Sequence, residues 1–259
     1  MKRFWVAAAA AFFIAFSAPA LDFYASGEER DKKETTIDLV KFIAKAPIPV
    51  GKFEGKTQKA FAHVNIKDMS DLAAGARAIF RVDLASIKTG IRLRDRDMRD
   101  KYLHTDKYPH AEFMLEKITA IYTVKEEDGK TTKTPVKGLA PGVETHLDAE
   151  GTLQIHGVKK QIQLKGFRVT HMPESEETKK DRKGGLLKTV GSFEIDMTDY
   201  SVKQPRVALF TVEKKVKLEF NILLGTGEKK VVSLPEEKEE EKEAETLKPE
   251  STPAENSGQ

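Results

Sequence analysis

Alternation of apolar and polar residues with a period of two is the feature that most constrains this chain. Every second residue from Val216 to Ile222 is apolar, and the residues between them are lysine, glutamate and asparagine. Residues 76–84 repeat the pattern, with Phe80 and Val82 on one face and Arg81 on the other. Because successive side chains of a strand point to opposite faces, such segments predict strands with one apolar face.

Similar segments recur and number about eight. They cover residues 35–40, 60–66, 76–84, 112–124, 151–155, 161–169, 190–197 and 216–224, with a shorter element around Phe53 and Gly55. Almost no helical pattern separates them, and strands joined by short connections pair antiparallel. A sheet of this size removes its edges best by closing, and an eight-stranded barrel is wide enough for one slender ligand. We therefore predict an all-β, antiparallel, roughly eight-stranded barrel.

Residues 85–109 are the one clear interruption. Thr89-Gly90 marks a turn, and Met98 and Tyr102 lie one helical turn apart in the charged segment that follows. Pro109 ends this segment, because the residue before a proline is driven towards extended geometry. The pattern predicts a short helical cap, a lid or plug across one end of the barrel.

Two further stretches have their own character. Residues 125–147 lack periodicity and are rich in turn residues, which favours a solvent-exposed hairpin extension. Residues 151–169 form a hairpin pattern with Gly157 at the turn. Residues 174–185 are predicted to be a charged loop.

The amino-terminal residues 1–20 have the pattern of a signal peptide. Lys2 and Arg3 precede an apolar run at residues 4–16, and Ala18-Pro19-Ala20 supplies small residues for cleavage. The run is short for a bilayer span, although an uncleaved anchor is the alternative. The mature protein is expected to begin near Leu21 and to be periplasmic or secreted. With no cysteine in the chain, neither a lipoprotein anchor nor a disulfide is available.

The rest of the chain divides into three parts. We expect a flexible leader at residues 21–33, the barrel at residues 34–225 and a disordered acidic tail at residues 226–259. From residue 235 the chain has nine glutamates against three lysines, whereas residues 21–234 are basic. This distribution suggests intramolecular screening or an envelope protein partner bound through the tail. An exported chain without an aromatic-interleaved basic surface argues against nucleic acid as a partner.

Side chains that could perform chemistry are few. The six histidines are scattered; His104 and His110 could bind a metal with Asp106, but histidines beside a surface turn are the commoner case. Asp95, Asp97 and Asp100 alternate with arginines and lysine, which favours a salt-bridged, solvated helix face. Alternatively, some of these arginines guard the barrel mouth and hold a phosphate or carbonyl head group. No catalytic residue, metal site or cofactor is predicted.

The inward-facing apolar side chains are the candidate ligand-binding residues, although periodicity cannot distinguish an open tunnel from a packed core. The predicted tunnel lining comprises Phe80, Val82, Met98, Tyr102, Phe113, Leu153, Ile155, Ile162, Leu164, Phe193, Ile195, Leu218 and Phe220.

Three blocks of sequence resemble the YceI-like, polyisoprenoid-binding family. They are Ser86-Ile87-x-Thr89-Gly90 through Lys107-Tyr108-Pro109-x-Ala111-x-Phe113, then Gly151-Thr152-Leu153-x-Ile155-His156-Gly157, and a weaker block at residues 193–202. The resemblance implies a lipocalin-like barrel with a helical cap, whose tunnel takes a polyisoprenoid lipid such as a polyprenyl phosphate or a quinone. Met98 stands where the family often has histidine, which leaves a head-group role at this position in doubt.

The leading hypothesis is therefore a carrier for a polyisoprenoid or similar long-chain amphiphilic lipid. A non-enzymatic envelope module with a filled barrel is the first alternative. An enzyme acting on an amphiphile is the second, and only the neighbourhood of Asp95, Asp97 and His104 favours it.

Overall fold

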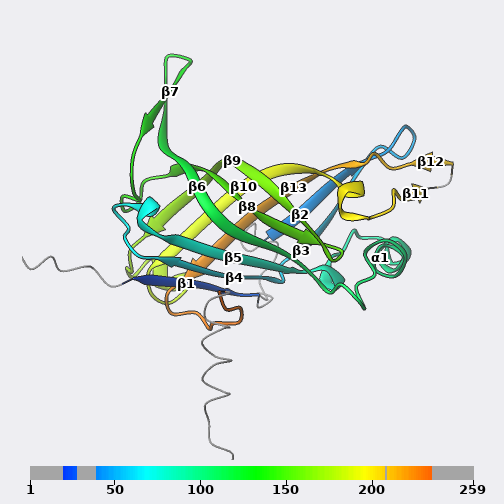
Figure 1. The fold of residues 1–259 in the computed structure, drawn as a ribbon, viewed down its shortest axis with the longest axis horizontal. Helices are drawn as coiled ribbons and strands as arrows, with labels where there is room; N and C mark the ends of the chain where they lie inside the picture. Colours follow the sequence, from blue (N-terminus) through cyan, green and yellow to red (C-terminus); the bar gives the residue numbers. More distant parts are fainter. Residues whose placement is uncertain (1–19, 28–38, 208, 235–259) are drawn as a thin grey trace, which may run out of the picture.

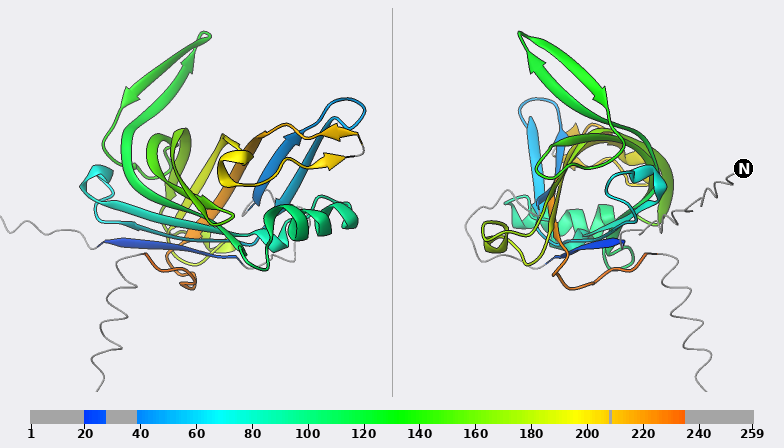
Figure 2. Two further views of the ribbon diagram at one scale, coloured as in Figure 1. Left: turned by 45° about the vertical axis from the view of Figure 1, so that its right-hand side comes forward. Right: turned by 90° about the vertical axis from the view of Figure 1, so that its left-hand side faces the viewer.

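A computed structural model describes residues 20–27, 39–207 and 209–234, and these form a closed antiparallel barrel of eight strands (Figure 1). In order around the barrel the strands are β1 (Leu21–Ser26), β4 (Ala60–Ile66), β5 (Ala76–Asp83), β6 (His110–Glu127), β8 (Thr145–Ile155), β9 (Val158–Met172), β10 (Leu186–Asp196) and β13 (Lys215–Gly225). Pairing of Tyr24 in β1 with Gly225 in β13 closes the circle. The predicted fold class is confirmed, and Figure 2 shows the strands curving round a common axis.

A second hairpin extends the wall at one end. β2 (Leu39–Lys45) pairs with the first half of β13, and β3 (Lys52–Thr57) pairs with β2. Lys56 and Lys88 then exchange two backbone hydrogen bonds of 2.9 Å, which tie β3 to the chain that follows β5. β1 therefore completes the wall at one end of the barrel, and the β2–β3 hairpin completes it at the other.

The predicted helical cap lies at the end of the barrel where the β2–β3 hairpin projects; we call this the cap end (Figure 2). It comprises the 3₁₀ turn η2 (Leu84–Ser86), α1 (Arg92–Asp97) and the π-helical segment η3 (Met98–Leu103). A second irregular region at this end comprises η5 (Met197–Tyr200), β11 (Arg206–Val207) and β12 (Phe210–Thr211). No helix among the described residues is long and apolar enough to span a bilayer.

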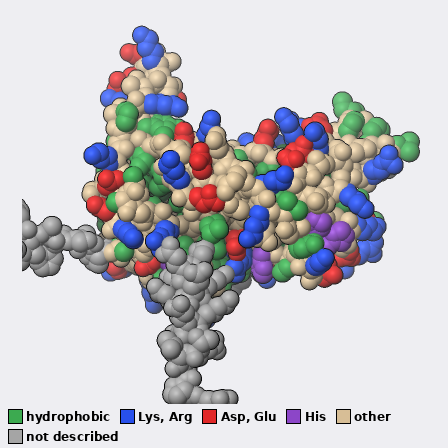
Figure 3. Space-filling view, viewed as in Figure 1, with side chains coloured by type: hydrophobic (Ala, Val, Ile, Leu, Met, Phe, Trp, Pro, Cys, Tyr) green, Lys and Arg blue, Asp and Glu red, His purple; other side chains and the backbone are tan. Residues whose placement is uncertain are grey.

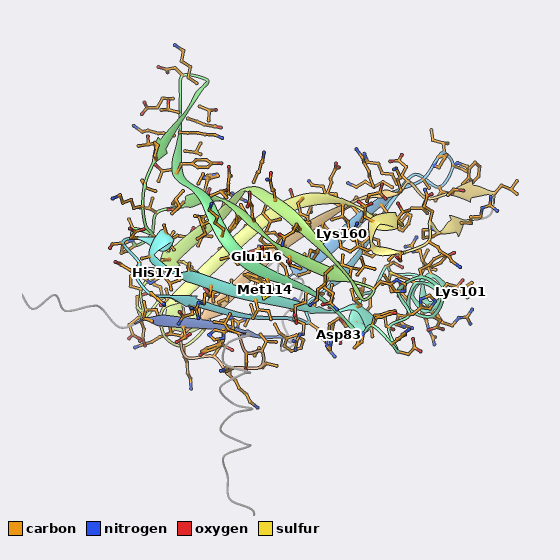
Figure 4. All side chains as sticks on the ribbon, in the orientation of Figure 1. Asp83, Lys101, Met114, Glu116, Lys160 and His171 are labelled. Atoms are coloured by element: carbon orange, nitrogen blue, oxygen red, sulfur yellow. The ribbon has the colours of Figure 1, made fainter. Side chains whose placement is uncertain are left out.

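The opposite end, which we call the far end, is closed by packed loops. Lys101 marks the cap end and His171 the far end in Figure 4. Here η1 (Leu72–Ala74) lies against residues 136–139: the Leu139 amide donates to Met69 O (2.8 Å) and the Leu72 amide donates to Lys137 O (3.0 Å). Both leucines are buried in the core cluster, so they plug this end. The 3₁₀ turn η4 (Thr178–Lys180) interrupts the charged loop between β9 and β10.

The solvent-exposed hairpin extension predicted at residues 125–147 is confirmed for residues 125–135 but is wrong for the rest, because Leu139 is buried at the far end and residues 145–147 belong to the barrel strand β8. β6 continues beyond the barrel and pairs with β7 (Lys130–Pro135), whose residues are all exposed. Asp128 and Gly129 turn the chain with φ of 52° and 72°, the left-handed region that a tight hairpin requires.

The predicted flexible leader is wrong for residues 21–26, because these residues form β1. Phe23 and Ala25 point into the core and are fully buried, and Asp22 lies 2.7 Å from Nε2 of the buried His63. A strand of six residues with only two core side chains carries little alternation signal, and long-range pairing with β4 fixes it. Residues 28–33 lie outside the described residues, as do residues 35–38 of the strand predicted at 35–40.

The predicted boundary of the disordered tail is also wrong. Residues 226–234 follow β13 and cover the outer face of the wall, where Val232 and Leu234 are buried against Ile79 and Phe61. The two apolar side chains hold this charged segment against the wall, because contact with Ile79 removes the apolar surface of all three residues from water. The remainder of the predicted tail, residues 235–259, lies outside the described residues.

Candidate functional site

The barrel interior contains an apolar cavity of about 200 Å³, which we call the inner cavity. Inward-facing side chains from strands around the barrel line it, among them Val64, Ala78 and Ile222. Among the described residues, its polar lining consists of Thr189, Glu112 and Glu219, and the two glutamate carboxylates are ion-paired with Arg81 and with Lys41 and Lys217. Of the side chains predicted to line a tunnel, Phe80, Val82, Phe113, Leu153, Ile155, Leu164, Phe193, Leu218 and Phe220 lie here.

A second space of about 480 Å³, the outer cavity, lies between the barrel, the cap and the β2–β3 hairpin. The predicted residues Met98, Tyr102, Ile155, Ile195 and Leu218 line it. Phe42, Leu84, Ile87, Ile155 and Leu218 line both cavities, which are therefore contiguous. Close-packed interiors contain few voids larger than a water molecule, so the two cavities set this interior apart from an ordinary packed core. The combined space falls in the range of about 300–1,000 Å³ that is typical of ligand sites.

Ile162 is the one predicted lining residue that contributes to neither cavity. It is half-buried and packs against the core cluster near the cap end. Its position follows the same alternation as Leu164, but it contributes to the packed cluster and not to a cavity wall. Periodicity gives the face of a strand and does not show where the space on that face is filled.

Three inward-facing glycines help to keep the lumen open, and sequence reasoning did not identify their role. A Cβ on Gly191 would lie 2.6 Å from the Phe220 ring, and one on Gly151 would lie 2.3 Å from the Met114 backbone oxygen and 2.6 Å from the Phe113 ring. A Cβ on Gly55 would lie 2.2 Å from the Phe42 ring. Each ring therefore covers a position without a side chain and lies against the barrel wall. A larger residue at any of these positions would displace the ring towards the lumen.

Arg94 provides a cationic group in the lining of the outer cavity. Its Nε donates to Thr89 Oγ1 (2.8 Å), its Nη2 donates to Thr89 O (2.8 Å), and the guanidinium lies 4.9 Å from the centre of the Phe53 ring. These contacts fix the direction of a side chain that would otherwise be mobile. The hypothesis that cap arginines guard the barrel mouth gains a specific candidate in Arg94, with Arg206 also in the lining.

The interpretation of the three aspartates as a solvated face is wrong for Asp95. This carboxylate is buried, and it accepts hydrogen bonds from the Thr89 amide (2.8 Å) and the Thr89 hydroxyl. It therefore fastens the turn before α1 to the helix. Asp97 matches the interpretation, because it pairs with Lys101 (3.1 Å) and Arg96 (3.4 Å), which together hold its pKa below the usual value.

Tyr200 keeps a further part of the outer cavity uncharged. Its side chain is almost fully buried in the lining, and burial raises its pKa to about 12. The phenol is therefore neutral at any physiological pH. In the part of the chain that the structure describes, Arg94, Asp97 and Arg206 are the residues with charged side chains in the lining of this cavity.

Two of the sequence blocks meet in space where the cap returns to the barrel. His104 Nδ1 lies 2.8 Å from His156 Nε2, and the Tyr108 ring packs edge-on against His156 with centroids 4.6 Å apart. A Cβ on Gly157 would lie 2.6 Å from Tyr108, so only glycine permits this approach. The metal alternative for His104 finds no support here, because the described residues contain no group of three potential metal ligands.

The closed antiparallel barrel with an apolar interior and a helical cap defines the class of fold. Residues 30–224 match the family described as the YceI-like domain, and the chain therefore belongs to this family. Similar solved structures include *Burkholderia cenocepacia* BcnA, with 18% identity over 72% of this chain and 96% of that chain, and a TM-score of 0.48.

Two further solved structures are similar to the chain. A polyisoprenoid binding domain from *Saccharophagus degradans*, implicated in plant cell wall breakdown, is 19% identical over 72% of this chain and 92% of that chain, with a TM-score of 0.49. A *Campylobacter jejuni* YCEI protein is 18% identical over 65% of this chain and 82% of that chain, with a TM-score of 0.42. No curated protein matches the chain. The fold assignment rests on the strand order described above and on the family match.

Proposed function

We propose that the protein is an exported carrier for a polyisoprenoid or a similar long-chain amphiphilic lipid. The observation that carries this proposal is the pair of contiguous apolar cavities that runs from the barrel interior to the cap end. The family membership supports it, as does the resemblance of the three sequence blocks to the polyisoprenoid-binding family. This lining is better suited to binding than to catalysis, because few of its side chains could take part in a reaction and these lie at the mouth.

The energetics favour a hydrocarbon chain as the occupant. Each CH₂ group moved out of water contributes roughly 0.8 kcal/mol, so even a few isoprene units supply most of the affinity of a typical ligand. The inner cavity offers such a chain almost no polar partner, whereas any polar ligand would lose hydrogen bonds to water there. We infer that the chain enters the inner cavity and that the head group stays in the outer cavity, near Arg94.

The head group is proposed to be a phosphate or a quinone carbonyl. A guanidinium whose Nε and one Nη are already fixed by Thr89 has further N–H groups for an incoming oxygen. A charge-assisted hydrogen bond to phosphate is stronger than one to a neutral carbonyl. Affinity for the two head groups should therefore depend differently on Arg94.

Leu153→Trp tests whether the lumen is the binding site. Leu153 lines the inner cavity, so the larger side chain should fill it and abolish binding of a prenyl phosphate or quinone. In a close-packed core the same change would cost roughly 1–3 kcal/mol of stability, whereas a tunnel should accept it with near-native stability. Binding is measured by titration with farnesyl phosphate and with a short prenyl quinone, and stability by urea unfolding.

Gln154→Trp is the matched control, because Gln154 neighbours Leu153 on β8 and lines neither cavity. It should keep both stability and binding. A strongly destabilised Leu153→Trp, together with a wild type that binds neither probe, would overturn the carrier proposal and favour the filled-barrel module.

Export, with an envelope protein as a partner for the acidic tail, is part of the proposal. Its support is the basic, apolar and small-residue pattern of residues 1–20 and the charge difference between tail and barrel. Amino-terminal sequencing of the exported protein should start near Leu21. That form should lack tryptophan fluorescence, since Trp5 is the only tryptophan. Retained tryptophan emission would show that the leader is not removed.

A further inference from the structure

Exposed apolar side chains gather at the cap end. Six large apolar residues are exposed among the described residues, and the four most exposed are Leu209 (93%), Ile48 (88%), Leu93 and Ile91. All four lie on segments around the outer cavity: the tip of the β2–β3 hairpin, the start of α1 and the β11–β12 turn. We call residues 45–52, 90–96, 203–206 and 209–211 the mouth rim.

The mouth rim projects beyond the barrel. Figures 1 and 2 show the β2–β3 tip, α1 and the β11–β12 tip extending from the same end, and Figure 3 shows hydrophobic side chains at the β11–β12 tip beside lysine and arginine. Ile91 and Leu93 also line the outer cavity, so the apolar surface continues from the rim inwards. Isolated exposed apolar residues need no explanation, but a group of them around one opening does.

Charge on the mouth rim is almost entirely positive. Its exposed basic residues come from all three tips: Lys45, Lys52, Arg92, Arg96, Lys203 and Arg206. Its single acidic residue is Asp95, which is buried and hydrogen-bonded to Thr89. Asp97, which pairs with Arg96 (3.4 Å), and the exposed Glu213 lie directly beside the rim and offset part of this charge. The β2–β3 tip and the β11–β12 segments contain no acidic residue.

We propose that the mouth rim docks on the surface of an anionic lipid bilayer. Interfacial membrane binding requires two kinds of contact. Apolar side chains enter the interface, and lysines and arginines contact the anionic head groups. Docking would place the outer cavity against the bilayer, so that a prenyl chain could pass between them without crossing water. This inference rests on the proposed carrier function, because it identifies the surface from which the ligand is taken. A folded protein partner would use the apolar tips but would not require anionic lipid.

Vesicle flotation of the full-length exported form tests the proposal. The protein is mixed with vesicles of phosphatidylcholine alone or of phosphatidylcholine and phosphatidylglycerol in equal amounts. Wild type should float only with the anionic vesicles, and added salt should release it because the Debye length shortens. Ile48→Ser with Leu209→Ser should reduce the bound fraction at least about tenfold, since both apolar tips are lost. Lys45→Gln, Lys52→Gln and Lys203→Gln together should have a similar effect.

Matched controls separate docking from folding and from lumen binding. Val143→Ser with Val231→Ser changes the two exposed apolar residues outside the rim, and Lys67→Gln with Lys130→Gln changes exposed lysines away from the cap end; both should bind vesicles like wild type. Neither Ile48 nor Leu209 lines a cavity, so the rim variant should still bind farnesyl phosphate in solution. Leu153→Trp should still float.

The outcomes distinguish the two proposals. Wild type that does not float with anionic vesicles, or rim variants that float like their controls, would overturn docking while leaving lumen binding intact. Vesicle binding by a wild type that never binds a prenyl probe would instead overturn the carrier function.

Discussion

The two ends of the barrel are built from the same strands but differ in what closes them. At the far end, Leu72 and Leu139 are buried plugs, and backbone hydrogen bonds join the loops that carry them. At the cap end, a cavity of about 480 Å³ remains beneath the cap, and Leu93 is mostly exposed. The far end is therefore the end whose packing stabilises the fold, and the cap end is the end at which a ligand could enter the barrel. The two roles lie at opposite ends of the barrel axis.

The attachments of the two ends explain why only one of them is suited to open. A Cβ on Gly138 would lie 2.2 Å from Met69 O, so the far-end loops approach at the closest distance that a backbone allows. The cap is attached to the barrel by the His104–His156 pair and by Tyr102 and Leu103, which are only partly buried against the core cluster. Segments with few buried apolar contacts are those that open most readily.

The largest effect should come from removing the ordered segment that leaves the far end. Truncation after Gly227 deletes Val232 and Leu234 and exposes Ile79. Each buried aliphatic side chain contributes roughly 1.5–3 kcal/mol, so the free energy of unfolding should fall by several kcal/mol. Urea unfolding measures it. Truncation after Leu234 is the control and should leave stability unchanged, because the charged remainder has too little apolar surface to pack. Equal stability of the two truncations would show that residues 228–234 do not hold the wall.

A pair of leucine truncations compares the ends directly. Leu139→Ala should lower the free energy of unfolding by roughly 2–5 kcal/mol, because it leaves a void in the far-end plug. Leu93→Ala removes the same atoms from an exposed position at the cap end and should change stability by no more than about 0.5 kcal/mol. If urea unfolding gives similar values for both, the cap end is as tightly packed as the far end, and the proposed asymmetry is wrong.

Local alternation was sufficient to predict the barrel and most of its lining. Residues such as Phe80 and Phe220 could be assigned to the lumen, because a strand with one apolar face turns that face towards the barrel interior. The same signal is present at Val40 and Val64, which also line the inner cavity but were not singled out. The sequence could not show whether the lumen is open, because that depends on side chains from many strands meeting in space.

The features that the sequence did not disclose all depend on long-range contacts. β1 is too short to show a clear alternation in the sequence. It is defined by its pairing with β4, which lies about forty residues away in the chain. The burial of Asp95 depends on a turn six residues before it, which a helical charge pattern cannot reveal. The packing of Phe220 over Gly191 joins two strands that pair along their whole length but are separated in the chain by the irregular segment that contains η5, β11 and β12.

The smallest effect, and the sharpest test of what the cap end recognises, should come from Arg94→Gln. Loss of one charge-assisted hydrogen bond should weaken farnesyl phosphate binding by about 10- to 100-fold. The same change should alter the affinity of a short prenyl quinone by only a small factor, because a glutamine amide can still donate to a carbonyl. Arg92→Gln is the matched control, since Arg92 is exposed on the same helix and lines neither cavity. Thermal unfolding should accompany both titrations, because Arg94 also holds Thr89 and its loss could loosen the turn before α1. If binding of the two probes weakens equally, Arg94 affects the structure of the outer cavity and does not contact the head group specifically. If only farnesyl phosphate binding is lost, the preferred class of ligand is a polyprenyl phosphate.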